Sequence, residues 1–209
     1  MTDAPSSDRR RQRGARSRQI ITRHAVDVAS LDGLGCLSFG RLADDLDISK
    51  AGIQTLFRTK QNLQLCTVET AREVFVDAVI RPAQEAPEGA PRLRALLEQW
   101  IAYVAQPLFP GGCFWNANLA EFDSHPGPIR DVLVQQRHDW LAILARQLEH
   151  AVAGRPLPET DIDLAVFQLD AALNATNTAL RLGESDGVEK LRRVLDGLLP
   201  PNPTSANVL

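Results

Sequence analysis

Three residues near the middle of the chain, Glu121, Asp123 and His125, carry side chains that could bind a metal ion or transfer a proton. Their spacing does not match a zinc-binding framework, and the sequence contains no HExxH helix and no paired Cys–His set. The other histidines are scattered along the chain: His24, His138 and His150. We therefore expect no metal site at these residues.

No nucleophile or cofactor motif accompanies these groups. Ser38 and Ser49 each stand where a helix is expected to begin, as capping residues do, and neither lies in a nucleophile elbow. The chain contains neither the GxGxxG fingerprint of dinucleotide sites nor a phosphate-binding P-loop. The sequence thus predicts a protein that is not an enzyme and that needs no cofactor.

Cys113 follows Gly111 and Gly112 at the expected start of a helix, where the helix dipole and free N–H groups favour a thiolate. Such a thiol could react with an oxidant or electrophile and convert that reaction into a change of shape. The alternative is that packing requires a small residue there. Cys36 and Cys66 are distant and form no CxxC pair, so the simplest setting is a reduced cytoplasm.

The composition is that of a globular protein with unevenly distributed charge. Of 209 residues, 44% are hydrophobic and 23% are charged, which excludes collagen-like and fully disordered classes. No apolar run approaches the roughly 20 residues of a membrane span, and the polar, Arg-rich start is not a secretory signal. Residues 1–60 carry a net charge of +4 and the remainder −7. Such asymmetry indicates a basic segment that meets a polyanion.

Hydrophobic spacing predicts helices throughout, so the expected fold class is all-α. The start of the chain lacks apolar positions and predicts a flexible basic arm over 1–15. Apolar residues then recur at three- and four-residue steps, with Gly and Pro between the segments. The expected helices span 16–32, 39–46, 50–57, 61–81, 92–105, 113–123, 128–152, 160–182 and 187–199, before a tail over 201–209.

Two of these helices, 39–46 and 50–57, are separated by only three residues, which is the spacing of a DNA-reading helix-turn-helix. Ser38 and Ser49 would cap them. The outer face of the second helix carries small or polar side chains suited to a major groove: Lys50, Ala51, Gln54 and Thr55. The pattern alone would also fit an ordinary helical hairpin.

Residues 17–63 resemble the DNA-binding domain of the TetR family of transcriptional repressors. The family has an Ile-rich first helix with Ala and Gly landmarks, matched here by Ile20, Ile21, Ala25 and Gly33. Its second helix starts at a hydroxyl residue and contains an Ile-Ala pair, matched by Ser38 and by Leu42-Ala43, and the turn that ends in Ser is matched by Asp47-Ile48-Ser49. The most specific match is the F-x-S-K-x-x-L junction, here Phe57-Arg58-Thr59-Lys60-Gln61-Asn62-Leu63. Gln54 replaces a Tyr that commonly contacts phosphate in the family, so Gln54 could bind a phosphate or a base. Thr59 replaces the Ser of the junction.

The resemblance implies a set of contacts to double-stranded DNA from a domain spanning 16–63. Lys60 and Ser38, at the starts of two helices, would approach phosphates, and helix N-termini and ammonium groups both favour phosphate oxygens. The arm would enter a minor groove or coat the backbone through Arg9, Arg10, Arg11 and Arg13. The arm's arginines could instead only confer solubility. The expected contacts from the helix-turn-helix are Ser38, Ser49, Lys50, Ala51, Gln54, Thr55 and Lys60.

Residues 64–200 resemble the C-terminal domain of one TetR subfamily, which carries GGC and PGP motifs, here Gly111-Gly112-Cys113 and Pro126-Gly127-Pro128. The resemblance implies a homodimer and a small-molecule inducer. Aromatic residues gather in this part, and a mostly apolar cavity suits an apolar or aromatic ligand. The candidate ligand-binding residues are Trp100, Tyr103, Cys113, Trp115, Asn116, Phe122, Trp140, Phe167, Asp170 and Asn174. Each could instead be ordinary core or interface.

Each of the last two expected helices has a stripe of residues that recur along one face. On 160–182 they are Leu164, Phe167, Ala171, Asn174 and Thr178, and on 187–199 they are the apolar residues Val188, Leu191, Val194, Leu195 and Leu198. A two-fold dimer would cover both stripes and place two recognition helices about 34 Å apart, whereas a monomer would have to cover them itself. We therefore expect a cytoplasmic, homodimeric repressor that leaves its operator when an inducer binds and that has no membrane partner. The alternative is a helical protein-interaction module that kept the fold and lost operator reading.

Overall fold

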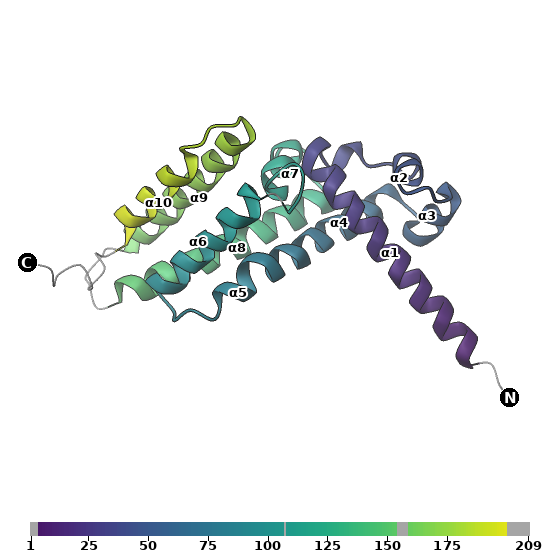
Figure 1. The fold of residues 1–209 in the computed structure, drawn as a ribbon, viewed down its shortest axis with the longest axis horizontal. Helices are drawn as coiled ribbons and strands as arrows, with labels where there is room; N and C mark the ends of the chain where they lie inside the picture. Colours follow the sequence, from purple (N-terminus) through teal and green to yellow (C-terminus); the bar gives the residue numbers. More distant parts are fainter. Residues whose placement is uncertain (1–3, 107, 154–158, 200–209) are drawn as a thin grey trace, which may run out of the picture. The chain divides into compact units, whose positions relative to one another are not determined.

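The computed structural model describes residues 4–106, 108–153 and 159–199, and the side chains of 11–106, 108–153 and 162–199. Within these ranges all regular elements are helical, so the predicted all-α fold class is confirmed (Figure 1). None of the helices described is long and apolar enough to cross a membrane. The elements are α1 (Ala4–Asp32), η1 (Leu34–Cys36), α2 (Phe39–Leu46), α3 (Lys50–Phe57), α4 (Lys60–Phe75), η2 (Val76–Ile80), α5 (Arg81–Ala83), α6 (Ala90–Ala105), α7 (Phe114–Phe122), α8 (Pro128–Val152), α9 (Glu159–Arg181) and α10 (Gly187–Leu198).

The chain divides into two compact units, and each is described by itself. The first unit contains the residues up to 74 together with 109–134, and the second contains the rest. This division differs from the boundary expected after residue 63, because α7 and the start of α8 cluster with the N-terminal helices. The reason is a set of contacts between residues far apart in sequence, which no local pattern reveals.

The first helix is longer than the sequence predicts. Residues 4–14, which we expected to form part of a flexible arm, are the first turns of α1. Arg, Gln and Ala are strong helix formers, and Pro5 lies in the first turn, where its missing N–H costs little. The predicted helix start at residue 16 was therefore wrong, because it rested on the absence of apolar residues rather than on helix propensity. The flexibility of the arm stays a prediction.

The helix that begins with α4 also continues beyond its predicted end at Arg81. Pro82 lacks a backbone N–H, but the five residues of η2 form a wider turn in which the amide of Arg81 donates to the carbonyl of Val76. The chain then stays helical through Pro82 to Ala83. The proline is accommodated by the wider turn, and a short connection leads to α6.

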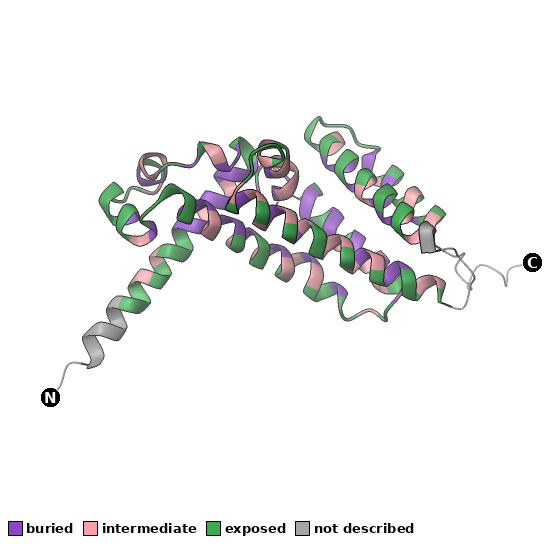
Figure 2. Ribbon diagram, turned by 180° about the vertical axis from the view of Figure 1, so that it is seen from behind, coloured by how far each residue is buried: buried purple, intermediate pink, exposed green. Residues whose placement is uncertain are grey.

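In each unit the buried residues lie where helices face one another, and the exposed residues lie on the outer faces (Figure 2). The core of the first unit contains apolar side chains of α1, α2, α3 and α4, including Ile21, Ala25, Leu42, Ile53, Phe57 and Leu63. The core of the second unit contains Leu93, Leu97 and Trp100 of α6, Leu144 and Leu148 of α8, and Leu169, Leu173, Leu191 and Leu195 of α9 and α10. Both cores follow the helical period of the sequence.

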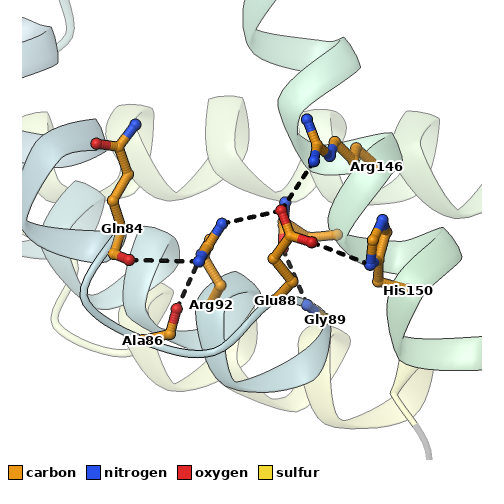
Figure 3. Close-up of polar contacts among 8 residues, drawn as sticks. Gln84, Ala86, Glu88, Gly89, Arg92, Arg146 and His150 are labelled. Atoms are coloured by element: carbon orange, nitrogen blue, oxygen red, sulfur yellow. Dashed lines mark hydrogen bonds and ion pairs between the residues drawn. The ribbon is translucent and has the colours of Figure 1, made fainter.

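A polar network around Glu88 holds the connection between α5 and α6 (Figure 3). One carboxylate oxygen accepts hydrogen bonds from Arg92 at 3.2 Å and Arg146 at 2.9 Å, and the other lies 3.4 Å from Nδ1 of His150. Arg92 also donates to two backbone carbonyls of this connection, those of Gln84 and Ala86. The network therefore joins α6 to α8, and His150 takes part in it through its contact with the Glu88 carboxylate.

Candidate functional site

The helix-turn-helix has the boundaries that the sequence predicts. The Ser38 Oγ accepts a hydrogen bond from the amide of Arg41 at 3.1 Å, which caps α2. Asp47 ends α2 with a φ of 50°, in the left-handed region, and so turns the chain sharply. The Ser49 Oγ accepts from the amide of Gly52 at 3.1 Å and caps α3. Both predicted caps form, and they fix the entry of each helix.

One face of α3 is buried and the other is open. Ile53 and Phe57 are almost fully buried, and they hold α3 on the core of the first unit. The four predicted DNA-facing residues are all exposed: Lys50, Ala51, Gln54 and Thr55. The Thr55 hydroxyl donates to the carbonyl of Ala51 at 2.8 Å, which orients it along the helix. The arrangement leaves an exposed, mainly polar surface of the kind that reads a major groove.

Lys60 lies at the first position of α4 and is exposed. Its Nζ donates a hydrogen bond to the backbone carbonyl of Gly35 at 2.5 Å. This contact fixes the ammonium group next to the start of α2, where Ser38 lies. An ammonium group has three N–H donors, so two of them stay available for phosphate oxygens. The sequence placed Lys60 at the helix start but gave no sign of its partner.

The arm residues lie on α1. Arg11 and Arg13 are exposed, whereas the side chains of Arg9 and Arg10 lie outside the described residues. Their predicted contact with DNA stays a prediction.

Two acidic groups of the first unit, Asp32 and Asp45, have partners within the unit. Arg41 pairs with Asp32 at 2.5 Å and lies 3.9 Å from Asp45, and His24 Nε2 lies 2.9 Å from Asp45. The hydrogen bond to Asp32 raises the pKa of Arg41 above its usual value, because the carboxylate stabilises the charged guanidinium. These pairs reduce the repulsion that free carboxylates would exert on a polyanion.

The GGC motif joins α7 to α1. The amide of Gly111 donates to the Ser30 Oγ at 3.0 Å, and a Cβ at Gly111 would overlap the backbone of Ser30. Gly112 has a φ of 83°, which favours glycine. Cys113 occupies the N-cap position of α7, as expected from its place at a helix start, but its side chain makes no capping hydrogen bond, and it is only 6% exposed. Its predicted reaction with oxidants or electrophiles stays a prediction, and burial supports the packing alternative.

The predicted ligand-binding residues fall in both units. Cys113, Trp115, Asn116 and Phe122 belong to the first unit, and Trp100, Tyr103, Trp140, Phe167, Asp170 and Asn174 belong to the second. They lie on α6, α7, α8 and α9 and in the segment before α7. That these ten residues bind one ligand stays a prediction.

Within the second unit, three aromatic side chains form a cluster. The Phe75 ring makes edge contacts with Tyr103 at 5.4 Å and with Trp140 at 5.3 Å, measured between ring centroids. Trp100 and Tyr103 are each 3% exposed. Sequence reasoning missed Phe75, which lies at the end of the helix leading from the DNA-binding region. Its aromatic type at an apolar helix position was the available signal.

Three predicted ligand-binding residues of α9 have other surroundings. Phe167 is 69% exposed, so it lines no interior surface of this chain. The Asp170 carboxylate accepts a hydrogen bond from Arg137 of α8 at 2.5 Å, and the Asn174 amide donates to the backbone carbonyl of Asp170 at 2.8 Å. Asp170 therefore has an ion-pair partner, and Asn174 has a hydrogen-bond partner within its own helix.

A cavity of about 500 Å³ lies in the first unit, and none of its lining residues is among those predicted to bind a ligand. It is lined by residues of α1, α3, α4 and the turn before α4, among them Arg18, Thr55, Phe57, Arg58 and Cys66. The Arg18 guanidinium donates to the carbonyl of Leu56 at 2.7 Å and to the Cys66 sulfur at 3.4 Å, and it lies over the Phe57 ring. Arg18 thus holds α1 on the end of α3, a role that the sequence did not reveal.

Glu121 and His125, which were considered for metal binding or proton transfer, have backbone partners. Glu121 Oε1 accepts a hydrogen bond from the amide of Gly35 at 2.9 Å, and His125 Nδ1 lies 2.9 Å from the carbonyl of Glu121. Among the described residues, no group of three or more His, Cys, Asp and Glu side chains is arranged to hold a metal ion. Glu121 is used to join α7 to the loop before α2.

The geometry agrees with a comparison to known families. Residues 89–195 match the model of the tetracyclin repressor-like C-terminal domain. The chain belongs to the TetR family. This membership confirms the resemblance and makes the protein a TetR-like DNA-binding regulator. No curated protein sequence matches the chain significantly.

Solved structures of TetR family regulators share the fold. A TetR regulator from Chloroflexus aurantiacus superposes with a TM-score of 0.77 at 19% identity, covering 90% of this chain and 94% of that one. A TetR-family regulator from Streptomyces coelicolor gives a TM-score of 0.73 at 19% identity, covering 88% and 94%. AibR, solved in complex with isovaleryl coenzyme A and operator DNA, gives 0.66 at 15% identity, covering 88% and 99%. At these identities the likeness shows the TetR fold alone.

Proposed function

We propose that this TetR family member is a homodimeric repressor that binds a two-fold symmetric operator and leaves it when a small apolar or aromatic inducer binds. The observation that carries the proposal is the open face of α3, with Lys50, Gln54 and Thr55 exposed while Ile53 and Phe57 are buried. A major groove accepts a helix of this kind, and Gln can bind adenine through two hydrogen bonds. Lys60 and Ser38 would bind phosphates beside it.

An uncovered face of α9 supports the dimer. Of the two stripes expected from the sequence, that of α10 is partly covered, with Leu191 and Leu195 almost fully buried. The stripe of α9 is exposed at every position: Leu164, Phe167, Ala171, Asn174 and Thr178. An exposed surface that contains large apolar side chains is typical of an interface. A second copy of the chain would cover it and would provide the second recognition helix.

The aromatic cluster of Phe75, Tyr103 and Trp140 supports an apolar or aromatic inducer. Sites for small molecules are lined mainly by hydrophobic and aromatic side chains. The AibR structure, which contains both a coenzyme A thioester and operator DNA, is a precedent within this fold for joint binding of the two ligand types. Release then requires that the inducer binds better to a conformation that fits the operator poorly.

The DNA-binding part of the proposal is tested by selection from a random DNA pool with the purified full-length protein. We expect enrichment of a sequence with two inverted half-sites about one helical turn apart. Binding to that sequence should exceed binding to a scrambled competitor and should weaken steeply as salt rises. Gln54→Ala should change the preference at one position of each half-site, whereas Lys190→Ala, an exposed substitution on α10, should not.

The inducer part is tested with the selected DNA. Apolar and aromatic compounds that change the tryptophan fluorescence of the protein should also release the DNA, and Tyr103→Ala should weaken both effects together.

Equal binding to selected and scrambled DNA would overturn the repressor proposal and favour the interaction module. Compounds that bind without any effect on DNA affinity would overturn only the inducer part.

A further inference from the structure

The short loop between α1 and α2 is held from two sides by the first unit. On one side, Asn118 and Glu121 of α7 bind the amides of Leu34 and Gly35, at 2.8 Å and 2.9 Å. On the other side, two residues of α4 donate to the carbonyls of the same two loop residues: Gln64 to Leu34 at 2.9 Å and Lys60 to Gly35 at 2.5 Å. The loop therefore links α7 to the start of α4.

The Glu121 carboxylate lies directly against the loop backbone. A Cβ at Gly33 or at Gly35 would overlap one of its two oxygens, so only glycine fits at these positions while the carboxylate stays in place. Gly33 also has a φ of 85°, which favours glycine independently. Oε2 of Glu121 is buried and accepts no hydrogen bond from the described residues. Burial of a carboxylate oxygen without a hydrogen-bond partner costs free energy. The carboxylate is therefore held in place by the packing around it and not only by its one hydrogen bond.

Gly35 connects Glu121 to Lys60. Its amide donates to Glu121, and its carbonyl accepts from the Lys60 ammonium group. Gly35 lies within η1, where the amides of Cys36 and Leu37 donate to the carbonyls of Gly33 and Leu34 at 3.3 Å and 3.2 Å, and this helical turn relates the direction of the Gly35 carbonyl to that of its amide. The carbonyl in turn holds an exposed lysine side chain that would otherwise sample many rotamers.

We infer that Glu121 is a positioning residue for the Lys60–phosphate contact: through Gly35, it holds the Lys60 ammonium group where a DNA phosphate will lie. This inference rests on the proposed function, in which Lys60 binds the operator backbone. Holding the side chain in advance reduces the entropy lost on binding and so raises affinity. A displacement of α7 would release Gly35 and then Lys60.

The test measures the salt dependence of binding to the selected operator DNA for four variants of the full-length protein. Lys60→Met should lower the slope of log K against log salt by about 0.9 for each phosphate that the lysine neutralises. Glu121→Ala should lower the slope by the same amount, and the double variant should show no further decrease. Glu121→Gln should restore the normal slope, because its amide oxygen can still accept from Gly35.

Two further variants separate positioning from stability. Gln64→Met removes the neighbouring bond to Leu34 but not the bond to Lys60, so it should leave the slope unchanged even where it lowers the melting temperature. Glu121→Asp keeps the charge but is one methylene too short to reach Gly35, so it should show the same lowered slope that is expected of Glu121→Ala. It therefore keeps the test available if the alanine variant does not fold. Thermal unfolding identifies the variants that are folded.

The outcomes distinguish this inference from the proposed function. A normal slope in both Glu121→Asp and folded Glu121→Ala, with a lowered slope in Lys60→Met, would overturn the inference and leave the repressor in place. An equal decrease in affinity from Glu121→Ala with and without Lys60 would also overturn it, since the effect would then not pass through Lys60. Absence of sequence-selective binding by the unaltered protein would instead overturn the proposed function.

Discussion

Asn118 of α7 accepts a hydrogen bond at 2.8 Å from the backbone amide of Leu34, which lies 84 positions earlier in the chain. Its side-chain amide donates to the carbonyls of Ala29 at 3.2 Å and Phe114 at 2.7 Å, and the residue is fully buried. One side chain thus joins the end of α1, the following loop and α7 itself. A buried polar residue of this kind stabilises only because each of its groups is paired.

We predict that Asn118→Ala destabilises the protein by about 2 to 4 kcal/mol, because it leaves the Leu34 amide and the Ala29 carbonyl buried without partners. Urea unfolding followed by circular dichroism measures the change. Asn62→Ala is the matched control, since Asn62 is exposed near the start of α4. Equal effects of the two substitutions would show that the Asn118 contacts are not formed in solution.

Gly111 lies close against the backbone of α1 at Ser30, which gives a second prediction. Gly111→Ala should destabilise by more than about 2 kcal/mol, because the new methyl group would overlap the backbone of Ser30 and α1 cannot yield locally. Gly14→Ala is the control: no atom lies within 4 Å of its Cβ position, and the helix should gain about 0.5 to 1 kcal/mol. A Gly111→Ala protein as stable as the unaltered one would contradict the close approach.

Local signals in the sequence predicted most helix boundaries. The limits of α2 and α3 follow from Ser38, Ser49 and the apolar positions between them, because capping and helical period act over a few residues. The same signals placed the exposed residues of α3 correctly. They failed at residues 4–14 and at Pro82, where helix propensity and a wider turn outweighed the pattern that we used.

The contacts that organise the candidate site could not be predicted, because they join residues far apart in sequence. The GGC motif marked Gly111 as unusual, but its reason is the backbone of Ser30, 81 positions away. Nothing in the sequence of α7 indicated that Glu121 binds Gly35, or that Lys60 shares that glycine. A charged residue on a helix has many possible partners, and only the packing of α7 on α1 selects one.

The ion pair between Glu98 of α6 and Arg192 of α10 predicts a dependence of stability on pH. Arg192 Nε and Nη2 donate to the two carboxylate oxygens at 2.8 Å and 2.7 Å. The hydrogen bond to Arg192 lowers the pKa of Glu98 below its usual value of 4.5. A lowered pKa means that the pair stabilises above the pKa of the unfolded state and that this stabilisation is lost as pH falls through the folded-state pKa.

We therefore expect Glu98→Gln to cost less than about 1 kcal/mol at pH 7, since both side chains are about half exposed, and to cost nothing well below pH 4. Unfolding free energies measured between pH 3 and pH 7 test this. Glu149→Gln, at an exposed position of α8, supplies the baseline for removing one charge. A difference that persists at pH 3 would show that packing of the side chain, not its charge, is responsible.

The exposed face of α9 predicts an effect of Phe167 on oligomeric state. Phe167 is 69% exposed in the single chain, and a glutamate there would place a charge in the proposed dimer interface. Phe167→Glu should weaken the dimer at least tenfold, as measured by sedimentation equilibrium. Leu31→Glu replaces a side chain of similar exposure, 60%, at the end of α1 and should leave the dimer intact. A Phe167→Glu dimer of normal strength would place the interface elsewhere.

The N-terminal turns of α1 give the last prediction, which separates a DNA contact from a solubilising role. Deletion of residues 1–13 removes Arg9, Arg10, Arg11 and Arg13. If these arginines bind the operator backbone, the slope of log K against log salt should fall by about 0.9 for each phosphate that they neutralise, while the base preference of α3 should not change. The measurement is the same titration with the truncated and full-length proteins. An unchanged slope together with lower solubility would assign the arginines to solubility alone, because a charge that does not neutralise a phosphate releases no counterions on binding.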